Sequence, residues 1–162
     1  MHYAAVLQLL VLLALANGSP IVAKWIFDAR FAWPLDGNLK FIDGKPLFGS
    51  SKTLRGIAVS LVITSIGAPL LGLTAAVGLL VASTAMAGDL LSSFLKRRLG
   101  MPSGGRATGL DQIPESLLPL LACRQLLSLT TLDIVVGTAI FFIGAVVLSQ
   151  LLFEWHVRDR SY

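Results

Sequence analysis

Two long apolar stretches constrain the fold of this chain more than any other feature of its sequence. Residues 3–23 are almost entirely apolar, and residues 56–95 form a still longer apolar region. A helix of about 20 apolar residues crosses the roughly 30 Å hydrocarbon core of a bilayer. Only 14% of the 162 residues are charged, whereas soluble domains are about a quarter charged. The sequence therefore predicts an all-α integral membrane protein with a single membrane-embedded domain over residues 1–162.

Breaks in the apolar pattern predict five transmembrane helices. Gly67-Ala68-Pro69 divides the longer region into two, and the resulting spans cover residues 3–23, 56–69, 71–95, 115–129 and 133–153, with polar loops at 24–55 and 96–114. Asn17-Gly18-Ser19-Pro20 is expected to kink or unwind the last turns of the first span. A cleaved signal peptide is the alternative interpretation of this span, but no basic segment precedes it.

Basic residues fall into three clusters that alternate with apolar stretches. The first lies in loop 24–55, the second in residues 96–106, and the third is Arg158 and Arg160 in the tail. Cytoplasmic loops carry an excess of Lys and Arg. Both loops and the C-terminus are therefore expected on the cytoplasmic side of the cell (inner) membrane, and the N-terminus is expected on the outer side. This pattern explains the net charge of +4 without nucleic-acid binding. Arg124 is expected to snorkel or pair within the fourth span.

A polar stripe marks the cytoplasmic end of the third span. At about 100° per residue, one helix face there contains Asp89, Ser92, Ser93 and Lys96, with Arg97 at its edge. Stop-transfer charges are the simple interpretation of the basic run. They do not explain the carboxylate, because an unpaired Asp costs about 2.5–3.5 kcal/mol at the centre of a membrane helix. The stripe therefore predicts a functional site at the membrane surface.

The loop after this stripe has residues suited to binding phosphate. Gly104 and Gly105 permit turns that bring backbone amides close to an anion, and Arg106 can donate two parallel hydrogen bonds to a phosphate. Asp111 is expected to meet Asp89 when the loop folds back over the helix end. Two carboxylates together with substrate phosphates are a usual way to hold Mg²⁺. An ordinary flexible loop is the alternative interpretation of the glycines.

A second cluster of phosphate-binding type lies in the stretch LFGSSKTLRG of the first loop. Lys52, Thr53 and Arg55 occur at the start of the second span, where helix-end amides favour an anion. The stretch lacks the Walker A pattern, and interfacial anchoring by its basic residues is the alternative. Glu115 is interpreted as a charge at a helix N-terminus, with metal binding as its secondary interpretation. No serine–histidine–acid set or activated cysteine is visible in the sequence.

The stretch GDLLSSFLKRRLGMPSGGRATGLDQIP, residues 88–114, closely resembles the signature segment of CDP-archaeol synthases, relatives of the CDP-diacylglycerol synthases. The shared pattern is Gly88-Asp89, Ser93 and Lys96-Arg97, followed by a glycine-bearing loop and an acidic residue. DGKPLFGSSKTLRG and ANGSPI are similar to the family's first cytoplasmic loop and to the end of its first helix. The chain lacks the His-Gly-Gly stretch and the additional acidic residue of the larger CDP-diacylglycerol synthases. The number of metal ions and the lipid tails therefore stay open.

The resemblance implies a Mg²⁺-dependent cytidylyltransferase that joins CTP to a membrane lipid phosphate. The products would be pyrophosphate and a CDP-activated lipid of the archaeol or diacylglycerol type. By motif position, Asp89 and Asp111 would be catalytic metal ligands and Lys96 a catalytic phosphate contact. The candidate substrate-binding residues are Lys52, Thr53, Arg55, Ser92, Ser93, Arg97, Gly104, Gly105 and Arg106. A homodimer is a possible assembly.

Two other functions fit part of the pattern. A small membrane transporter of anions or lipids with a basic cytoplasmic vestibule would explain an intramembrane acid. However, the sequence shows no inverted repeat, and its polar residues gather at one membrane face. A CDP-alcohol phosphotransferase would show regularly spaced aspartates after an Asp-Gly pair, and these do not follow Asp36-Gly37 or Asp43-Gly44. The cytidylyltransferase is therefore the favoured prediction, with the transporter as the alternative.

Overall fold

The computed structural model describes residues 2–28, 30–105 and 107–154, without the side chains of residues 151–154. Within these residues the chain forms five helices: α1 (Tyr3–Phe27), α2 (Leu54–Leu70), α3 (Ala75–Arg98), α4 (Gln112–Ala122) and α5 (Thr131–Glu154). The remaining regular pairing in this part of the chain is two isolated bridges in the α1–α2 loop. The all-α prediction is confirmed. Arg106, Arg158 and Arg160 lie outside the described residues.

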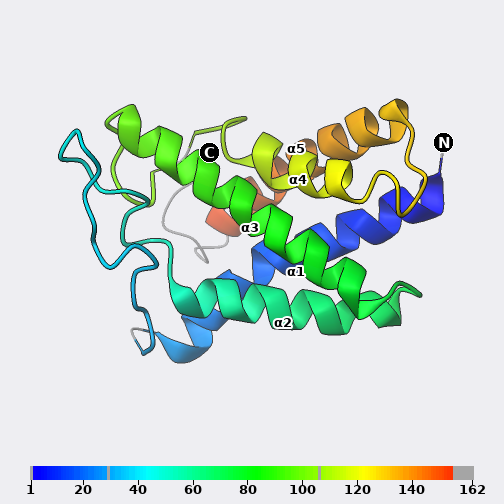
Figure 1. The fold of residues 1–162 in the computed structure, drawn as a ribbon, viewed down its shortest axis with the longest axis horizontal. Helices are drawn as coiled ribbons and strands as arrows, with labels where there is room; N and C mark the ends of the chain where they lie inside the picture. Colours follow the sequence, from blue (N-terminus) through cyan, green and yellow to red (C-terminus); the bar gives the residue numbers. More distant parts are fainter. Residues whose placement is uncertain (1, 29, 106, 155–162) are drawn as a thin grey trace.

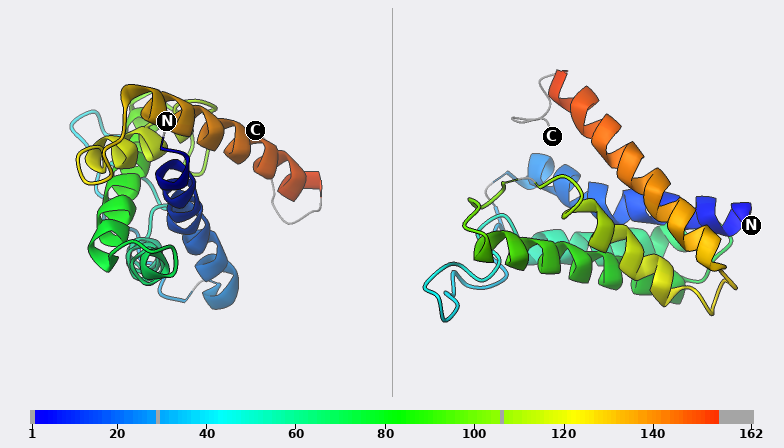
Figure 2. Two further views of the ribbon diagram at one scale, coloured as in Figure 1. Left: turned by 90° about the vertical axis from the view of Figure 1, so that its right-hand side faces the viewer. Right: turned by 90° about the horizontal axis from the view of Figure 1, so that it is seen from above.

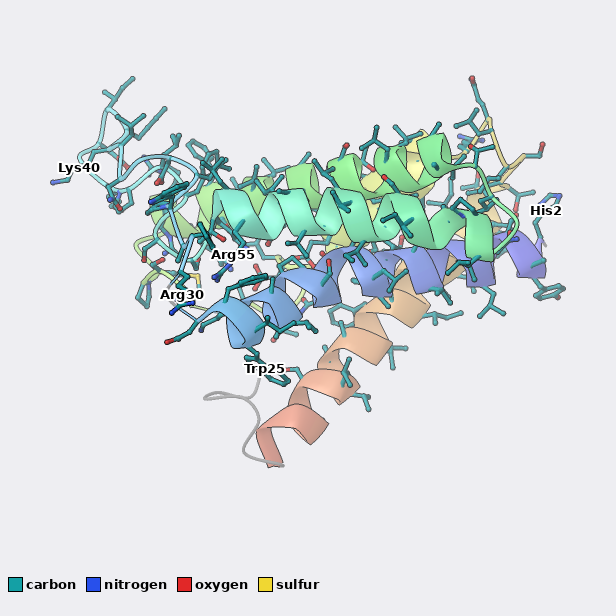
Figure 3. The ribbon with its side chains drawn as sticks, turned by 90° about the horizontal axis from the view of Figure 1, so that it is seen from below. His2, Trp25, Arg30, Lys40 and Arg55 are labelled. Atoms are coloured by element: carbon teal, nitrogen blue, oxygen red, sulfur yellow. The ribbon has the colours of Figure 1, made fainter. Side chains whose placement is uncertain are left out.

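The helices bring the two long polar loops to the same end of the molecule. Helix α3 packs against α1, α2 and α4, and the α1–α2 and α3–α4 loops emerge together at the end opposite the N-terminus (Figure 1). The labelled basic side chains Arg30, Lys40 and Arg55 lie at that end, whereas His2 lies at the other (Figure 3). The two candidate phosphate-binding loops are therefore neighbours in space.

Three helices, α1, α3 and α5, are long and apolar enough to cross a membrane, by length and composition. Helix α2 is apolar but has only 17 residues. The fourth expected span, 115–129, is wrong as a continuous helix, because α4 ends at Ala122 and residues 123–128 form turns. The backbone N–H of Leu129 donates to the carbonyl of Arg124 at 2.8 Å and closes these turns. Arg124 lies exposed within these turns and not within a helix.

Helix α1 stays helical through Pro20 as far as Phe27, so the expected unwinding at residues 17–20 does not occur. Proline has no backbone N–H, and its presence leaves the carbonyl four residues earlier without its helical donor. That carbonyl belongs to Ala16, and the Ser60 hydroxyl of α2 donates to it at 2.8 Å. A neighbouring helix thus replaces the missing bond, as membrane-protein interiors require.

Small residues on α3 allow its neighbours to approach closely, as their spacing in the sequence predicts. A Cβ built on Gly78 would lie only 2.5 Å from the carbonyl oxygen of Thr64 on α2. A Cβ built on Gly88 would lie 2.4 Å from the carbonyl oxygen of Pro114 on α4. Gly88 directly precedes Asp89 in the sequence. The start of α4 is therefore held against the part of α3 that contains the candidate carboxylate.

Candidate active site

Lys52 and Asp89 form the first ion pair of the candidate site. Thr53 caps the N-terminus of α2 by accepting a hydrogen bond from the Gly56 N–H at 3.1 Å. This cap fixes the end of the first loop, and Lys52 precedes it directly. The Lys52 ammonium lies 2.5 Å from both carboxylate oxygens of Asp89 on α3. The first polar loop thus contributes a cation to the carboxylate at the membrane end of the stripe.

Lys96 and Asp111 form a second, more buried ion pair. The Lys96 ammonium lies 2.6 Å from Oδ1 of Asp111 and also donates to the carbonyl of Gly105 at 2.9 Å. The Ser92 hydroxyl contacts the carbonyl of Leu110 at 2.7 Å, which ties the loop to α3 next to Asp111. These bonds fold the α3–α4 loop back over the helix end. This folding is what the sequence predicts, although the ammonium rather than Asp89 meets Asp111.

Glu115, which the sequence places at a helix N-terminus with metal binding as its secondary interpretation, is the third carboxylate at the candidate site. It lies on the first turn of α4, with its carboxyl group against that of Asp89 and within the electrostatic field of Lys52 and Asp111. The tight contact at Gly88 places it there, because the backbone N–H of Glu115 would lie 2.8 Å from a Cβ at that glycine. The acidic residue four positions after Asp111 is the sequence signal that points to it.

The carboxylates of the site suit a cation but do not form a ready-made metal cage. In the part of the chain that the structure describes, no three His, Cys, Asp or Glu side chains are grouped to hold a metal. Instead, Lys52 and Lys96 each place a positive charge on one aspartate. The carboxyl groups of Asp89 and Glu115 touch and therefore repel unless a cation or a proton lies between them. Oxygen donors of this kind fit a Mg²⁺ ion that is completed by substrate phosphates.

Arg97 is a buried cation with unused hydrogen-bond donors. The residue is 3% exposed, and among the residues that the structure describes its Nε and one terminal nitrogen, Nη1, have no hydrogen-bond partner. It lines a pocket of about 240 Å³ between the two loops, together with residues that include Lys45, Met101 and Ser103. Buried polar groups usually have partners. A guanidinium with free donors beside a pocket can therefore bind an anionic or carbonyl-bearing ligand there.

Asp36 organises the first loop from its interior. Its carboxylate accepts backbone N–H bonds from Asn38, Phe48 and Gly49 at 2.9–3.0 Å. Burial alone would raise the pKa of Asp36, but the three backbone donors outweigh it and lower the pKa below its usual value. The Asp-Gly pair in the sequence signals a turn, but it does not reveal the bonds to residues 48 and 49. Asp36 thus fixes the segment that leads to Lys52.

We expect Asp36→Ala to loosen the first loop while leaving the helices folded. A buried N–H bond to a charged acceptor contributes about 1.5–3 kcal/mol, so amide exchange at Phe48 and Gly49 should accelerate at least about tenfold. Because the folded-state pKa is lowered, this stabilisation is complete above the unfolded value of about 3.9 and disappears as the pH falls through the folded value. Hydrogen-exchange mass spectrometry of wild type, Asp36→Ala and the exposed control Asp28→Ala checks this. Unchanged exchange in Asp36→Ala would contradict it.

Arg98 fastens the tip of the first loop to the end of α3. Its guanidinium donates to Asp43 and to the carbonyls of Lys45 and Pro46, and it lies 4.8 Å and 5.0 Å from the ring centroids of Phe41 and Phe94. Lys45 returns a bond to the carbonyl of Arg98 at 2.9 Å. These contacts hold the loop over the pocket beside Arg97. Arg98, in the basic run after the polar stripe, therefore stabilises the position of the first loop in addition to marking the membrane edge.

The other candidate residues take varied positions. Arg55 donates to the carbonyls of Asp28 and Arg30 at the end of α1, and Ser93 is buried within α3. Gly104 has a φ of 74°, and a Cβ at Gly105 would lie 2.8 Å from the carbonyl of Pro102, so both glycines are needed for this turn. Arg106 lies outside the described residues. Lys52, Asp89, Lys96 and Asp111 are therefore the candidates that the fold most directly joins into ion pairs.

Comparison with known proteins identifies similar sequences. A family model described as CarS-like, CDP-archaeol synthase, matches residues 68–157. The CDP-archaeol synthase of Pyrobaculum calidifontis is 42% identical over 111 residues, which cover 65% of this chain and 66% of that protein. That of Hyperthermus butylicus is 38% identical over 105 residues, covering 60% and 59%, and one from Saccharolobus islandicus is 37% identical over 119 residues, covering 68% of each. The matches thus span about three-fifths to two-thirds of these relatives' lengths.

A solved structure supports the same comparison at the level of the fold. It is described as an intramembrane enzyme for archaeal membrane lipid biosynthesis, and it superimposes with a TM-score of 0.75. The two chains are 28% identical, and the alignment covers 87% of this chain and 90% of that one. The similarity therefore extends across nearly all of the helical arrangement described above.

Proposed function

The chain belongs to the CarS-like CDP-archaeol synthase family, and on that premise we propose that it is a CTP-dependent cytidylyltransferase. Its substrates in this proposal are CTP and a membrane lipid phosphate, and its products are a CDP-activated lipid and pyrophosphate. The reaction would serve phospholipid biosynthesis. The observation that carries the proposal is the pair of ion pairs, Lys52–Asp89 and Lys96–Asp111, at the end where both polar loops meet.

The position of these ion pairs suits one soluble and one membrane-bound substrate. Asp89 lies about two and a half turns before the end of α3, a helix that is long and apolar enough to cross a membrane. The pocket beside Arg97 opens between the two polar loops. A water-soluble nucleotide would approach from the loops, while a lipid phosphate would approach from the bilayer. Both would reach the same group of charges.

The phosphates of both substrates need neutralisation more than chemical activation. In the proposed reaction, an oxygen of the lipid phosphate bonds to the α-phosphorus of CTP. The bond from that phosphorus to the β-bridging oxygen breaks, and pyrophosphate leaves with the bonding electron pair. Lys52, Lys96 and Arg97 would position the two polyanions and offset their mutual repulsion. No covalent enzyme intermediate is required.

Mg²⁺ is the metal that best suits these residues. Asp89 and Asp111 would hold it, as the sequence predicts, and Glu115 would be an additional carboxylate of the same site because it lies against Asp89. Mg²⁺ prefers one or two carboxylates together with substrate phosphates. When bound, the ion would stabilise negative charge on the phosphate oxygens. The lysines that neutralise the aspartates in this structure would then be released to bind phosphate.

We also propose that the molecule spans the cell (inner) membrane with its active site at the cytoplasmic face. Both polar loops lie at one end of the helices and contain most of the basic residues, which favours the cytoplasm for that end. In this arrangement α2 and the α4 segment complete a five-span domain with the N-terminus outside. The turns at residues 123–128 would face the outer side.

An assay of the purified full-length chain tests the proposed function. In detergent micelles with labelled CTP, Mg²⁺ and a panel of ether- and ester-linked lipid phosphates, we expect CDP-lipid and pyrophosphate in equal amounts. Removing the metal with EDTA should abolish both products, and restoring excess Mg²⁺ should recover them. Anion flux across liposomes without any CDP-lipid would overturn the proposal in favour of the transporter.

A further inference from the structure

A basic and aromatic segment at the end of α1 does not belong to the ion-pair site. This segment, residues 24–33, reads KWIFDARFAW. Its two cations, Lys24 and Arg30, are exposed, and in the part of the chain that the structure describes neither has an ion-pair partner. Asp28 is the one carboxylate of the segment, so positive charge is in excess. Such a surface attracts an anion.

The length of α1 places this segment in the headgroup layer of a membrane. Its 25 residues extend about 37 Å at 1.5 Å per residue, whereas the hydrocarbon core of a bilayer is about 30 Å thick. A helix that crosses the core therefore continues into the headgroup layer, and the residues after it start there. Trp25 and Ile26, in the last turn of α1, are exposed at this level.

Three aromatic rings form one exposed cluster in this segment. Phe27 packs edge-to-face against Phe31 with ring centroids 6.4 Å apart, and Phe31 packs in the same way against Trp33 at 6.3 Å. Asp28 and Phe31 have positive φ angles of 45° and 58°, which non-glycine residues rarely adopt outside tight turns. All three rings remain exposed to the surroundings. Exposed aromatic side chains of this kind are typical of the membrane–water interface.

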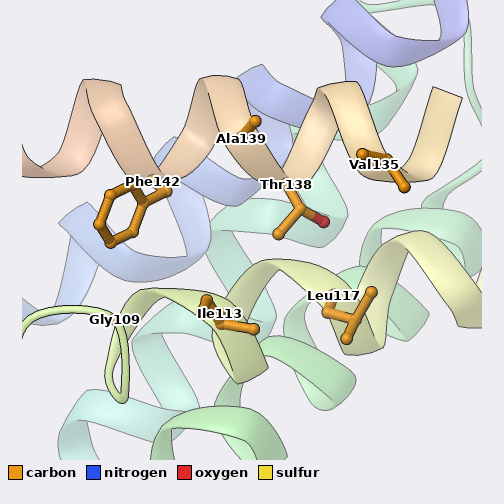
Figure 4. Close-up of a pocket in the computed structure, with 7 residues that line it drawn as sticks. All are labelled: Gly109, Ile113, Leu117, Val135, Thr138, Ala139 and Phe142. Carbon is orange, nitrogen blue, oxygen red and sulfur yellow. The ribbon is translucent and has the colours of Figure 1, made fainter. Parts of the chain in front are cut away.

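Helix α5 does not cover this end of α1. The two helices start side by side and diverge toward the loop end (Figure 2), where Trp25, Arg30 and Arg55 lie (Figure 3). The groove between α4 and α5 differs in character, because its described lining is apolar apart from the Thr138 hydroxyl and contains no charged side chain (Figure 4). An anionic headgroup therefore has positive partners at residues 24–33 and none in that groove.

Backbone hydrogen bonds connect this segment to Lys52. The N–H of Leu54 donates to the carbonyl of Trp33 at 3.1 Å, and the N–H of Leu35 donates to the carbonyl of Lys52 at 2.8 Å. These two bonds join the end of the segment to the residues on both sides of the α2 cap. Lys52 is also the residue whose ammonium pairs with Asp89. The order of the segment and the position of Lys52 are therefore coupled.

Arg55 connects the same turn to the start of α2. Its guanidinium donates to the carbonyl of Asp28 at 3.0 Å and to the carbonyl of Arg30. Because a guanidinium stays charged, Arg55 is a third cation beside this turn. A ligand that orders the turn would also order the start of α2, three residues after Lys52.

We propose that residues 24–33 bind the anionic headgroup of a membrane phospholipid and that this binding fixes the position of Lys52. Lys24 and Arg30 would pair with the headgroup, and the aromatic rings would lie beside it in the interface. Each Lys or Arg near an anionic membrane surface strengthens binding by about fivefold. The inference goes beyond the proposed function, because it holds whichever reaction takes place at the ion pairs.

Native mass spectrometry of the full-length protein tests the binding. The protein is released from nanodiscs that contain equal amounts of phosphatidylglycerol and phosphatidylcholine, and the retained lipids are counted. We expect the wild type to retain phosphatidylglycerol at least about fivefold over phosphatidylcholine. Lys24→Gln combined with Arg30→Gln should abolish this preference. Lys24→Arg combined with Arg30→Lys keeps both charges and should preserve it.

Lys40→Gln is the matched control for this experiment. Lys40 is an exposed cation of the same loop, but it lies at the protruding tip, away from the helix ends (Figure 3). We expect this variant to keep the wild-type preference. Equal retention of the two lipids by the wild type would overturn the proposal, as would an equal loss of preference in Lys40→Gln. A dimer that Trp25→Ala converts to a monomer would assign the segment to a second copy of the chain and would also overturn it.

Hydrogen exchange tests the connection to Lys52. We expect the N–H groups of Leu35 and Leu54 to exchange at least about fivefold more slowly in phosphatidylglycerol nanodiscs than in phosphatidylcholine nanodiscs. In Lys24→Gln combined with Arg30→Gln, the two membranes should give the same exchange rates. Equal rates in the wild type would overturn the coupling. Neither experiment contains CTP, so a failure to form CDP-lipid would refute the enzymatic proposal and leave the lipid site standing.

Discussion

Replacing Asp89 with Asn is expected to reduce CDP-lipid formation at least about 100-fold, a loss typical of removing a charge that stabilises a transition state or orients a metal. The substitution keeps the shape of the side chain but removes the negative charge that faces Lys52 at 2.5 Å. It also removes one of the two predicted Mg²⁺ ligands. The measurement is the rate of labelled CDP-lipid formation at saturating CTP, with the apparent Mg²⁺ affinity determined in parallel.

Asp43→Asn is the matched control for this prediction. Asp43 is also an aspartate paired with a basic residue, Arg98, but it lies in the first loop and is not part of the ion-pair site. We expect its effect on the rate to be less than about twofold. Turnover of Asp89→Asn at the wild-type rate would contradict the metal-site proposal. A matching loss in both variants would indicate that the loops, rather than the carboxylate, determine activity.

Replacing Gly88 with Ala is expected to separate α3 from α4 and to lower thermal stability. The added methyl group would meet the backbone of Pro114 and Glu115 at 2.4–2.8 Å, and a backbone cannot rotate away as a side chain can. Overpacking of this kind costs about 1–3 kcal/mol, and each kcal/mol corresponds to roughly 2–4 °C in Tm for a chain of this size. The shift would also move Glu115 and Asp111 away from Asp89. We therefore expect lower activity together with a lower Tm in detergent.

Gly144→Ala is the control that isolates this packing effect. Gly144 also lies in a helix, α5, but no atom of the described part of the chain is within 4 Å of its Cβ position. Alanine has the higher helix propensity by about 1 kcal/mol, so Gly144→Ala should leave Tm unchanged or raise it. A lower Tm in Gly88→Ala together with an unchanged or higher Tm in Gly144→Ala would identify the α3–α4 contact as the cause of the lost stability. An unchanged Tm in Gly88→Ala would show that α3 and α4 do not approach each other closely at Gly88.

The α-helical class and the two polar loops were predictable because they depend on local properties of the chain. Apolar length, basic clusters and the phase of the stripe from Asp89 to Lys96 follow from residue spacing alone. The same spacing identified Gly88 as a small residue suited to close packing. The expected fourth span failed because hydropathy does not detect the turn closed between Arg124 and Leu129. The expected unwinding at Pro20 failed because its compensating donor, Ser60, is on another helix.

The partners of the charged groups were decided only by the tertiary structure. The sequence by itself predicted that the loop after the stripe folds back and brings Asp111 to it, and the Lys96–Asp111 ion pair agrees with that prediction. It could not determine that Lys52 would reach Asp89 from 37 residues away or that Glu115 would lie against the same carboxyl group. These contacts depend on how closely α3 approaches α4, which Gly88 permits, and on the bonds that Asp36 makes within the first loop. Electrostatic pairing acts over a few ångströms, so it follows from the packing of the helices and loops and not from residue spacing.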